Sequence, residues 1–140
     1  MTFDLETAGY TEILKMDSSS GFENTYGALY DDTLYIMSGK STMYSASVSG
    51  GKIEEVKPDM SLIPDLCDYY SIRTYDGKVY ILMADSYNTS TALCEYDVEK
   101  NQLIPLVTTG EEMKARDFCI VGDTYYMWYG SRYVSGTLPE

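Results

Sequence analysis

Short apolar segments recur along the chain at intervals of about 45 residues, each directly after a turn signal. The turn signals are the pairs Asp31-Asp32, Asp76-Gly77 and Gly122-Asp123, and the segments are LYIM (34–37), VYIL (79–82) and YYMW (125–128). Asp and Gly tolerate the positive φ angles of two-residue hairpin turns. Because the apolar segments do not alternate with polar residues, they are typical of strands covered on both faces. The pattern predicts three β-hairpins with buried second strands.

A second outline, strand–turn–strand, occurs once before the first hairpin and once after each of the first two. It is seen in FDLETAGYTEIL (3–14), ASVSGGKIEEVK (46–57) and YDVEKNQLIPLV (96–107). Joined to the hairpins, it gives antiparallel units of four strands at 23–57 and 69–107. Residues 116–138 form an incomplete unit, and residues 1–15 hold a final strand pair alone. No segment shows a clear helical pattern, and a helix in GEEMKAR (110–116) would be one turn at most.

The period also predicts equivalent positions on the second strand of each hairpin. Tyr35, Tyr80 and Tyr126 should be equivalent, and so should Met37, Leu82 and Trp128. Trp128, the single tryptophan of the chain, is therefore expected to be buried between two sheets.

A four-stranded antiparallel unit of this length is the signature of a β-propeller blade. The pattern resembles the broad Kelch-like and PQQ-like propeller class, especially the tyrosine-rich propeller segments of secreted bacterial proteins. The Kelch diglycine is absent from the end of the second strand, and neither the GH…WD pair of WD repeats nor the SxDxGxTW box of sialidases occurs. The resemblance therefore implies an all-β fold of about three blades, a partial propeller over residues 1–140, and no particular activity.

Charge limits the partners. The net charge is −12, and the 10 Lys and Arg residues are scattered singly, so neither nucleic acid nor an anionic membrane surface is an expected partner. No apolar run approaches the roughly 18 residues of a membrane span. MTFDLETAG (1–9) lacks the basic and apolar regions of a signal peptide. The chain is expected to be cytoplasmic, or extracellular or in the cell envelope if it is a piece of a secreted protein.

The residue types present restrict the chemistry further. The chain has no histidine, which removes histidine-based catalysis and imidazole metal sites. The cysteines, at 67, 94 and 119, form no CxxC pair and are interpreted as small buried residues of strands. Most carboxylates fall in turns, and the Asp residues of segment 59–68 are separated by apolar residues that suggest a packed loop rather than a calcium site. We expect no catalytic residue, metal or cofactor.

Propellers usually bind ligands at one end of their central channel, close to the start of each blade's first strand. The residues expected there are Tyr69, Tyr70, Arg73, Tyr87, Asn88, Arg116 and Asp117. Tyrosine and arginine suit a recognition surface because they offer large contact areas or several donors. The alternative is that the tyrosines pack between blades and the arginines pair with nearby acids.

Two functions fit these observations. The first is a non-enzymatic binding or scaffold module for a protein or a carbohydrate. The second is a carboxylate-dependent polysaccharide hydrolase or lyase, which would need two acids about 5–10 Å apart in an aromatic cleft. Three blades do not close a propeller, so the remainder of a longer chain or a homodimer is expected to complete it.

Overall fold

The protein is represented by a computed structural model, which describes residues 2–4, 9–11, 26–38, 42–50, 52–87, 89–109 and 115–140. These residues form strands and turns, and none of them is helical. The all-β prediction is therefore confirmed for this part of the chain. Segment 110–116, for which the sequence allows one helical turn at most, falls largely outside it.

Every sheet is antiparallel and joins strands that are consecutive in the chain. A two-stranded sheet holds β1 (Thr2–Asp4) and β2 (Gly9–Thr11). The first four-stranded sheet holds β3 (Tyr26–Tyr30), β4 (Thr33–Ser38), β5 (Thr42–Ser47) and β6 (Glu54–Val56). The second holds β7 (Leu66–Tyr75), β8 (Lys78–Asp85), β9 (Thr91–Asp97) and β10 (Gln102–Thr109). A three-stranded sheet holds β11 (Asp117–Val121), β12 (Thr124–Tyr129) and β13 (Arg132–Thr137).

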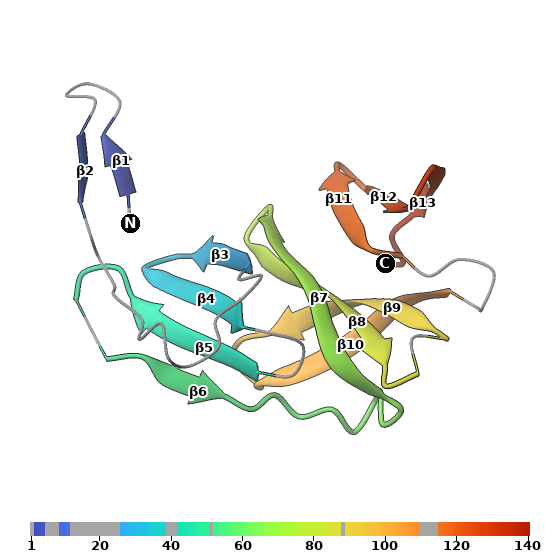
Figure 1. Ribbon diagram of the computed structural model, residues 1–140, viewed down its shortest axis with the longest axis horizontal. Coiled ribbons are helices and arrows are strands. Elements are labelled where there is room, and N and C mark those ends of the chain that lie inside the picture. Colours follow the sequence, from blue (N-terminus) through green and yellow to red (C-terminus); the bar gives the residue numbers. More distant parts are fainter. Residues whose placement is uncertain are drawn as a thin grey trace.

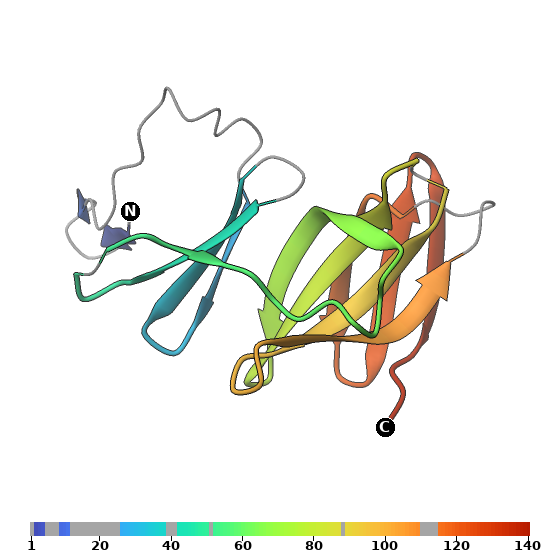
Figure 2. The ribbon, with the colours of Figure 1, turned by 90° about the horizontal axis from the view of Figure 1, so that it is seen from below.

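The three larger sheets stand side by side in chain order, with β7–β10 in the middle (Figures 1 and 2). Their first strands approach one another, since β7 contacts both β3 and β11. The segment between β6 and β7 follows the outer edge of β10, where the backbone N of Asp59 donates to the carbonyl O of Asn101 at 2.7 Å. This segment shields an edge strand that would otherwise present unpaired backbone groups.

The three predicted hairpins are present in one register. The residues that flank the turn are paired as Tyr30–Thr33, Tyr75–Lys78 and Val121–Thr124. Asp31 and Asp76 both have a φ of 49°, and Gly122 has a φ of 64°. The turn residues were therefore correctly identified by their tolerance of positive φ.

A backbone hydrogen bond repeats in two of these sheets. The residue after the third strand returns to the hairpin turn, where Val48 N donates to Asp32 O at 2.9 Å and Leu138 N donates to Asp123 O at 2.7 Å. The two turns are equivalent in the predicted period. The repeat therefore extends from the hairpin to the end of the third strand.

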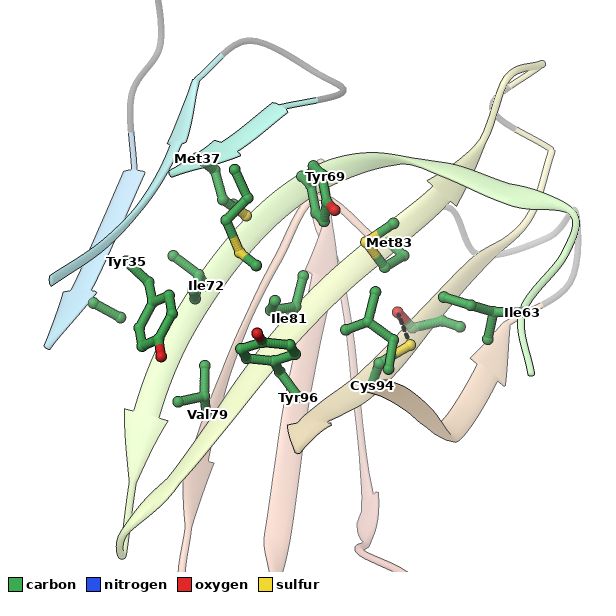
Figure 3. Close-up of a cluster of buried hydrophobic side chains, with 14 residues drawn as sticks. Tyr35, Met37, Ile63, Tyr69, Ile72, Val79, Ile81, Met83, Cys94 and Tyr96 are labelled. Carbon is green, nitrogen blue, oxygen red and sulfur yellow. Dashed lines mark hydrogen bonds between the residues drawn. The ribbon is translucent and has the colours of Figure 1, made fainter. Parts of the chain in front are cut away.

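The first core cluster fills the space between β3–β6 and β7–β10. Tyr35 and Met37 of β4 point from one side toward Ile72 of β7 and Ile81 of β8 (Figure 3), and all are buried. Tyr35 and Tyr96 meet edge to face with ring centroids 5.7 Å apart, an arrangement that aromatic pairs favour. This packing fixes the first sheet against the second.

The second core cluster lies between β7–β10 and β11–β13. It contains Tyr80 and Leu82 of β8, together with Phe118, Ile120 and Met127 of the last sheet. The residues of β8 that alternate with Tyr80 and Leu82 face the first core cluster instead. The prediction of a strand covered on both faces is thus confirmed for β8.

Trp128 corrects one expectation. It occupies the position predicted from Met37 and Leu82, yet it is only half-buried. Its neighbours Met127 and Tyr129 face the second core cluster, so Trp128 points to the opposite side of the sheet. No described sheet covers that side, which is why the predicted burial was wrong.

The cysteines correct a second expectation, namely that all three are buried in strands. Cys94 is buried in the first core cluster as expected, but Cys67 is exposed and Cys119 is intermediate. Cys67 is an extra residue in β7, where the register passes from Leu66–Asp85 to Asp68–Ala84. Such a bulge breaks the alternation of side chains, so the apolar pattern could not place this residue.

Candidate functional site

The candidate site lies on the seam between β7 and β11. It begins with a second β-bulge in β7, since Tyr69 pairs with Met83 and Ser71 with Leu82, which leaves Tyr70 as the extra residue. Tyr69 packs into the first core cluster, whereas Tyr70 packs against the second. The bulge therefore turns both Tyr70 and Ser71 toward the last sheet.

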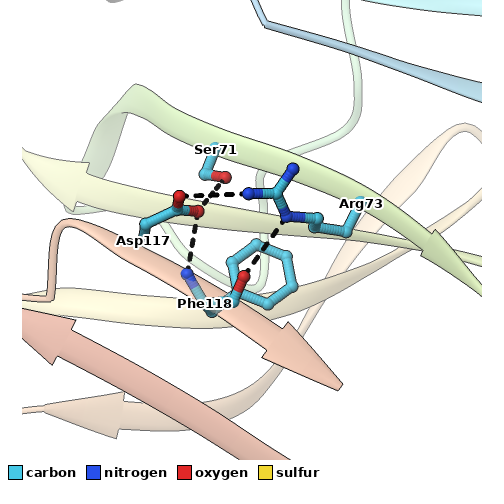
Figure 4. Close-up of polar contacts among 4 residues, drawn as sticks. All are labelled: Ser71, Arg73, Asp117 and Phe118. Carbon is cyan, nitrogen blue, oxygen red and sulfur yellow. Dashed lines mark hydrogen bonds and ion pairs between the residues drawn. The ribbon is translucent and has the colours of Figure 1, made fainter. Parts of the chain in front are cut away.

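Asp117 accepts hydrogen bonds from three donors, and two of them, Ser71 and Arg73, lie on β7 and so join the two sheets (Figure 4). Ser71 Oγ donates to Asp117 Oδ1 at 2.5 Å, and Arg73 Nη2 lies 3.1 Å from Asp117 Oδ2. The backbone N of Phe118 donates to Asp117 Oδ1 at 2.9 Å, and Arg73 Nε donates to the carbonyl O of Phe118 at 3.3 Å. The predicted site residues Arg73 and Asp117 thus meet, as an ion pair that holds the seam together.

Arg116 lies between two tyrosine rings, an arrangement that we call the Tyr–Arg–Tyr stack. Its guanidinium carbon is 5.7 Å from the ring centroid of Tyr70 and 5.4 Å from that of Tyr129. Burial raises the pKa of Tyr70, and the positive charge of Arg116 acts against that rise. Arg116 remains exposed, so the stack presents a positioned guanidinium to the solvent.

The other predicted residues do not join this group. Tyr69 is buried, and its burial raises the pKa of the hydroxyl to about 12, so its role is packing. Tyr87 is exposed at the turn after β8. Asn88 falls outside the described residues. Tyr69 and Arg73 are thus used for packing and pairing, whereas Arg116 is exposed, and a ligand-binding role of these residues stays a prediction.

Sequence reasoning missed Tyr129 and Ser71. Tyr129 is at the end of β12, where its ring meets Arg116, and Ser71 follows the bulge and meets Asp117 of the last sheet. Nothing in a single sequence marks such contacts. A weak signal existed for Tyr129 alone, because Arg116 precedes the strand that pairs with β12.

Shallow hollows occur at both ends of the sheets. One of about 240 Å³ is lined by the loop 62–66 and by the ends of β9 and β10. Two others, of about 260 and 250 Å³, flank the hairpin turn at Asp76-Gly77. All three are smaller than the roughly 300–1,000 Å³ of typical small-molecule sites.

The pKa values of three carboxylates in turns indicate whether these groups could serve as general acids. Hydrogen bonds from the hydroxyls of Ser47 and Ser49 lower the pKa of Asp32, and the turn amides of Ser61 and Lys100 lower the pKa values of Asp59 and Asp97. A general acid at neutral pH requires a carboxyl pKa shifted upward. These three carboxylates are therefore turn-forming groups.

No group of three or more potential metal-ligating side chains comes together in the described ranges. Within the same ranges there is no helix with the length and apolar character needed to cross a membrane. Comparison with protein-family models and with curated proteins gave no match to this chain.

Proposed function

We propose that this chain is a non-enzymatic binding module built from propeller-type sheets, with the Tyr–Arg–Tyr stack at the centre of its recognition surface. The observation that carries the proposal is the exposed guanidinium of Arg116 held between Tyr70 and Tyr129. Side chains already held in place lose little freedom on binding. Tyrosine and arginine are also the residue types that dominate binding hot spots.

The propeller part of the proposal is supported by the arrangement of the sheets. Each of the three sheets starts with the strand nearest its neighbour, and the hairpin turns share one register. Three such sheets are fewer than the four to eight blades that close a ring. Further sheets, from the remainder of a longer chain, would complete it.

The binding role is favoured over the hydrolase or lyase by the state of Asp117. Its carboxylate already accepts hydrogen bonds from Ser71, Arg73 and the backbone of Phe118. Both carboxylate oxygens of Asp117 are therefore engaged by the protein itself, which leaves this group poorly placed to act on a bound sugar. The partner we propose is a protein or carbohydrate that offers a carboxylate group to Arg116, since a guanidinium pairs well with carboxylates. The net charge of −12 opposes the approach of any extended polyanion, so the contact is local to the stack and is tested at an ionic strength that screens the long-range repulsion.

Calorimetry on the full chain tests this proposal with polygalacturonate as the acidic probe and dextran as the neutral one. We expect polygalacturonate to bind and dextran not to bind. Arg116→Ala should weaken binding about tenfold or more, since bonds to charged groups contribute about 1.5–3 kcal/mol. Lys52→Ala, at an exposed cation near the turn between β5 and β6, is the matched control and should bind as the wild type does.

Two results would contradict the proposal. Unchanged binding in Arg116→Ala would remove the stack from the recognition surface. Release of new reducing ends or unsaturated sugars from polygalacturonate would favour the enzyme instead. An array of acidic peptides, read with the same two variants, extends the test to protein partners.

A further inference from the structure

The far side of the last sheet presents a face that is uncharged except at one edge. Phe118, Ile120 and Met127 point into the second core cluster, so the residues that alternate with them point outward. One of these, Asp117, lies at the edge beside β7, where it pairs with Arg73. The others, which we call the open face, are Cys119, Val121, Thr124, Tyr126, Trp128, Tyr133, Ser135 and Thr137. Tyr126 is 43% exposed and Tyr133 is 75% exposed. Large exposed aromatic residues gathered on one sheet face are typical of an interaction surface.

The open face continues two interfaces already present in the molecule. Tyr35 and Met37 on β4 are covered by the second sheet, and Tyr80 and Leu82 on β8 are covered by the third. Tyr126 and Trp128 occupy the same two positions after their turn. These two positions are thus buried against a neighbouring sheet in the first and second sheets. In the third sheet they have no other sheet against them among the described residues.

We infer that the open face is where two copies of this chain associate, each contributing the same face. None of its eight residues is charged, so two acidic chains can bring these faces together with their charges at the periphery. The opposite end of the row of sheets offers a poorer apolar match, because Ile36 and Ala46 on the far side of β4 and β5 are already buried and Leu29 contributes the exposed apolar surface there, at 51% exposure. A contact between identical faces is the commonest symmetric arrangement.

The area of the open face sets the expected affinity of the dimer. Three strands of about six residues cover roughly 300 Å², from a spacing of about 4.8 Å and a rise of about 3.4 Å per residue. A standard stable interface buries about 800 Å² on each partner. The dimer is therefore weak, with dissociation in the micromolar to millimolar range. Added salt strengthens it, because salt screens the repulsion between two chains of net charge −12.

Trp128 is a built-in reporter, since it is the single tryptophan and lies on the open face. Sedimentation velocity and tryptophan emission are measured on the full chain from about 1 µM to about 1 mM, a range that brackets the expected dissociation constant. We expect the mass to rise toward that of a dimer while the emission shifts to shorter wavelength over the same concentrations.

Tyr126→Asp places a carboxylate in the middle of the face and should weaken the dimer about tenfold or more. Tyr26→Asp is the matched control, because Tyr26 is 45% exposed on β3, and it should associate as the wild type does. Tyr133→Asp is a second test on the most exposed tyrosine of the face. Circular dichroism melting checks that each variant is folded.

Three outcomes would overturn the inference. The first is a monomer over the whole concentration range. The second is a dimer that Tyr126→Asp and Tyr133→Asp leave intact, or that Tyr26→Asp disrupts equally. The third is quenching of Trp128 by soluble xylan without any change in mass, which would assign the face to a carbohydrate instead of a second copy.

Discussion

Ser71 on β7 donates a hydrogen bond to Asp117 on β11, with 2.5 Å between Ser71 Oγ and Asp117 Oδ1. Ser71 is 1% exposed, so its hydroxyl depends on this acceptor. The bond exists because the bulge at Tyr70 turns Ser71 toward the last sheet. One irregularity in β7 thus fixes how the second and third sheets meet.

Asp117→Ala should lower the free energy of unfolding by about 1–3 kcal/mol, because it leaves the buried hydroxyl of Ser71 without its acceptor. Asp117→Asn keeps an oxygen for Ser71 and loses the ion pair with Arg73, whose side chain is half-exposed. That loss should be below about 1 kcal/mol. Urea denaturation measures both values. Lys100→Ala, which removes the exposed pair with Asp97, serves as the control with a change within about 0.5 kcal/mol, and equal losses for Ala and Asn would contradict the argument.

The fold was largely predictable because its signals are local. Pairs such as Asp76-Gly77 determine the hairpin turns through φ, and the period of about 45 residues assigns the strands to sheets. The burial of Trp128 was not predictable in this way, since it depends on whether another sheet lies against β12. Periodicity locates equivalent positions, but the neighbour of each position decides its environment.

The sequence indicated most residues of the candidate site, but not which of them contact one another. Arg73, Asp117, Tyr70 and Arg116 were all among the candidates, yet which of them pair depends on the bulge at Tyr70. A bulge is a response to packing from both faces and leaves no clear sequence signal. For the same reason the partner Tyr129 was missed.

Phe118→Ala should destabilise the protein by about 3–5 kcal/mol, because Phe118 is fully buried in the second core cluster. Trp128→Ala should lower the free energy of unfolding by less than about 2 kcal/mol, because the side chain of Trp128 is only partly buried in the folded protein. Both are measured by thermal or urea denaturation at low protein concentration, where the monomer dominates. An equal loss of stability in the two variants would contradict the partial burial of Trp128.

Gly136→Ala should be destabilising by about 1–3 kcal/mol through overpacking. Gly136 pairs with Tyr125 across β12 and β13, and a Cβ at Gly136 would lie 2.7 Å from Cζ of Tyr125. Tyr125 packs against the second core cluster and cannot move without disturbing it.

Gly27→Ala is the matched control for Gly136→Ala. A Cβ at Gly27 would meet ordinary contacts of 3.5 and 3.7 Å, so the change should be neutral or stabilising by up to about 1 kcal/mol. Denaturation midpoints of the two variants give the comparison. If Gly136→Ala proved as harmless as Gly27→Ala, the Tyr125 ring would not be fixed against β13.

Alkaline pH should unfold the protein through three acids of the first core cluster. Burial raises the pKa values of Tyr69 and Tyr96 from 10.0 to about 12, and that of Cys94 from 9.0 to about 12. Each group is favoured in its neutral form by folding. Its contribution to stability is therefore fully present below the unfolded pKa and is lost as the pH rises through the folded one. The free energy of unfolding should begin to fall above pH 9 and continue to fall toward pH 12.

Tyr69→Phe tests this directly, because it removes one of the three acids and keeps the ring in the core. Its free energy of unfolding should decline less steeply than that of the wild type between pH 10 and 12. Tyr133→Phe changes a tyrosine that is 75% exposed, and it should follow the wild-type curve throughout. Urea denaturation at fixed ionic strength across this range gives the curves. Identical slopes for the wild type and Tyr69→Phe would mean that the Tyr69 hydroxyl titrates alike in the folded and unfolded chain, contrary to its burial.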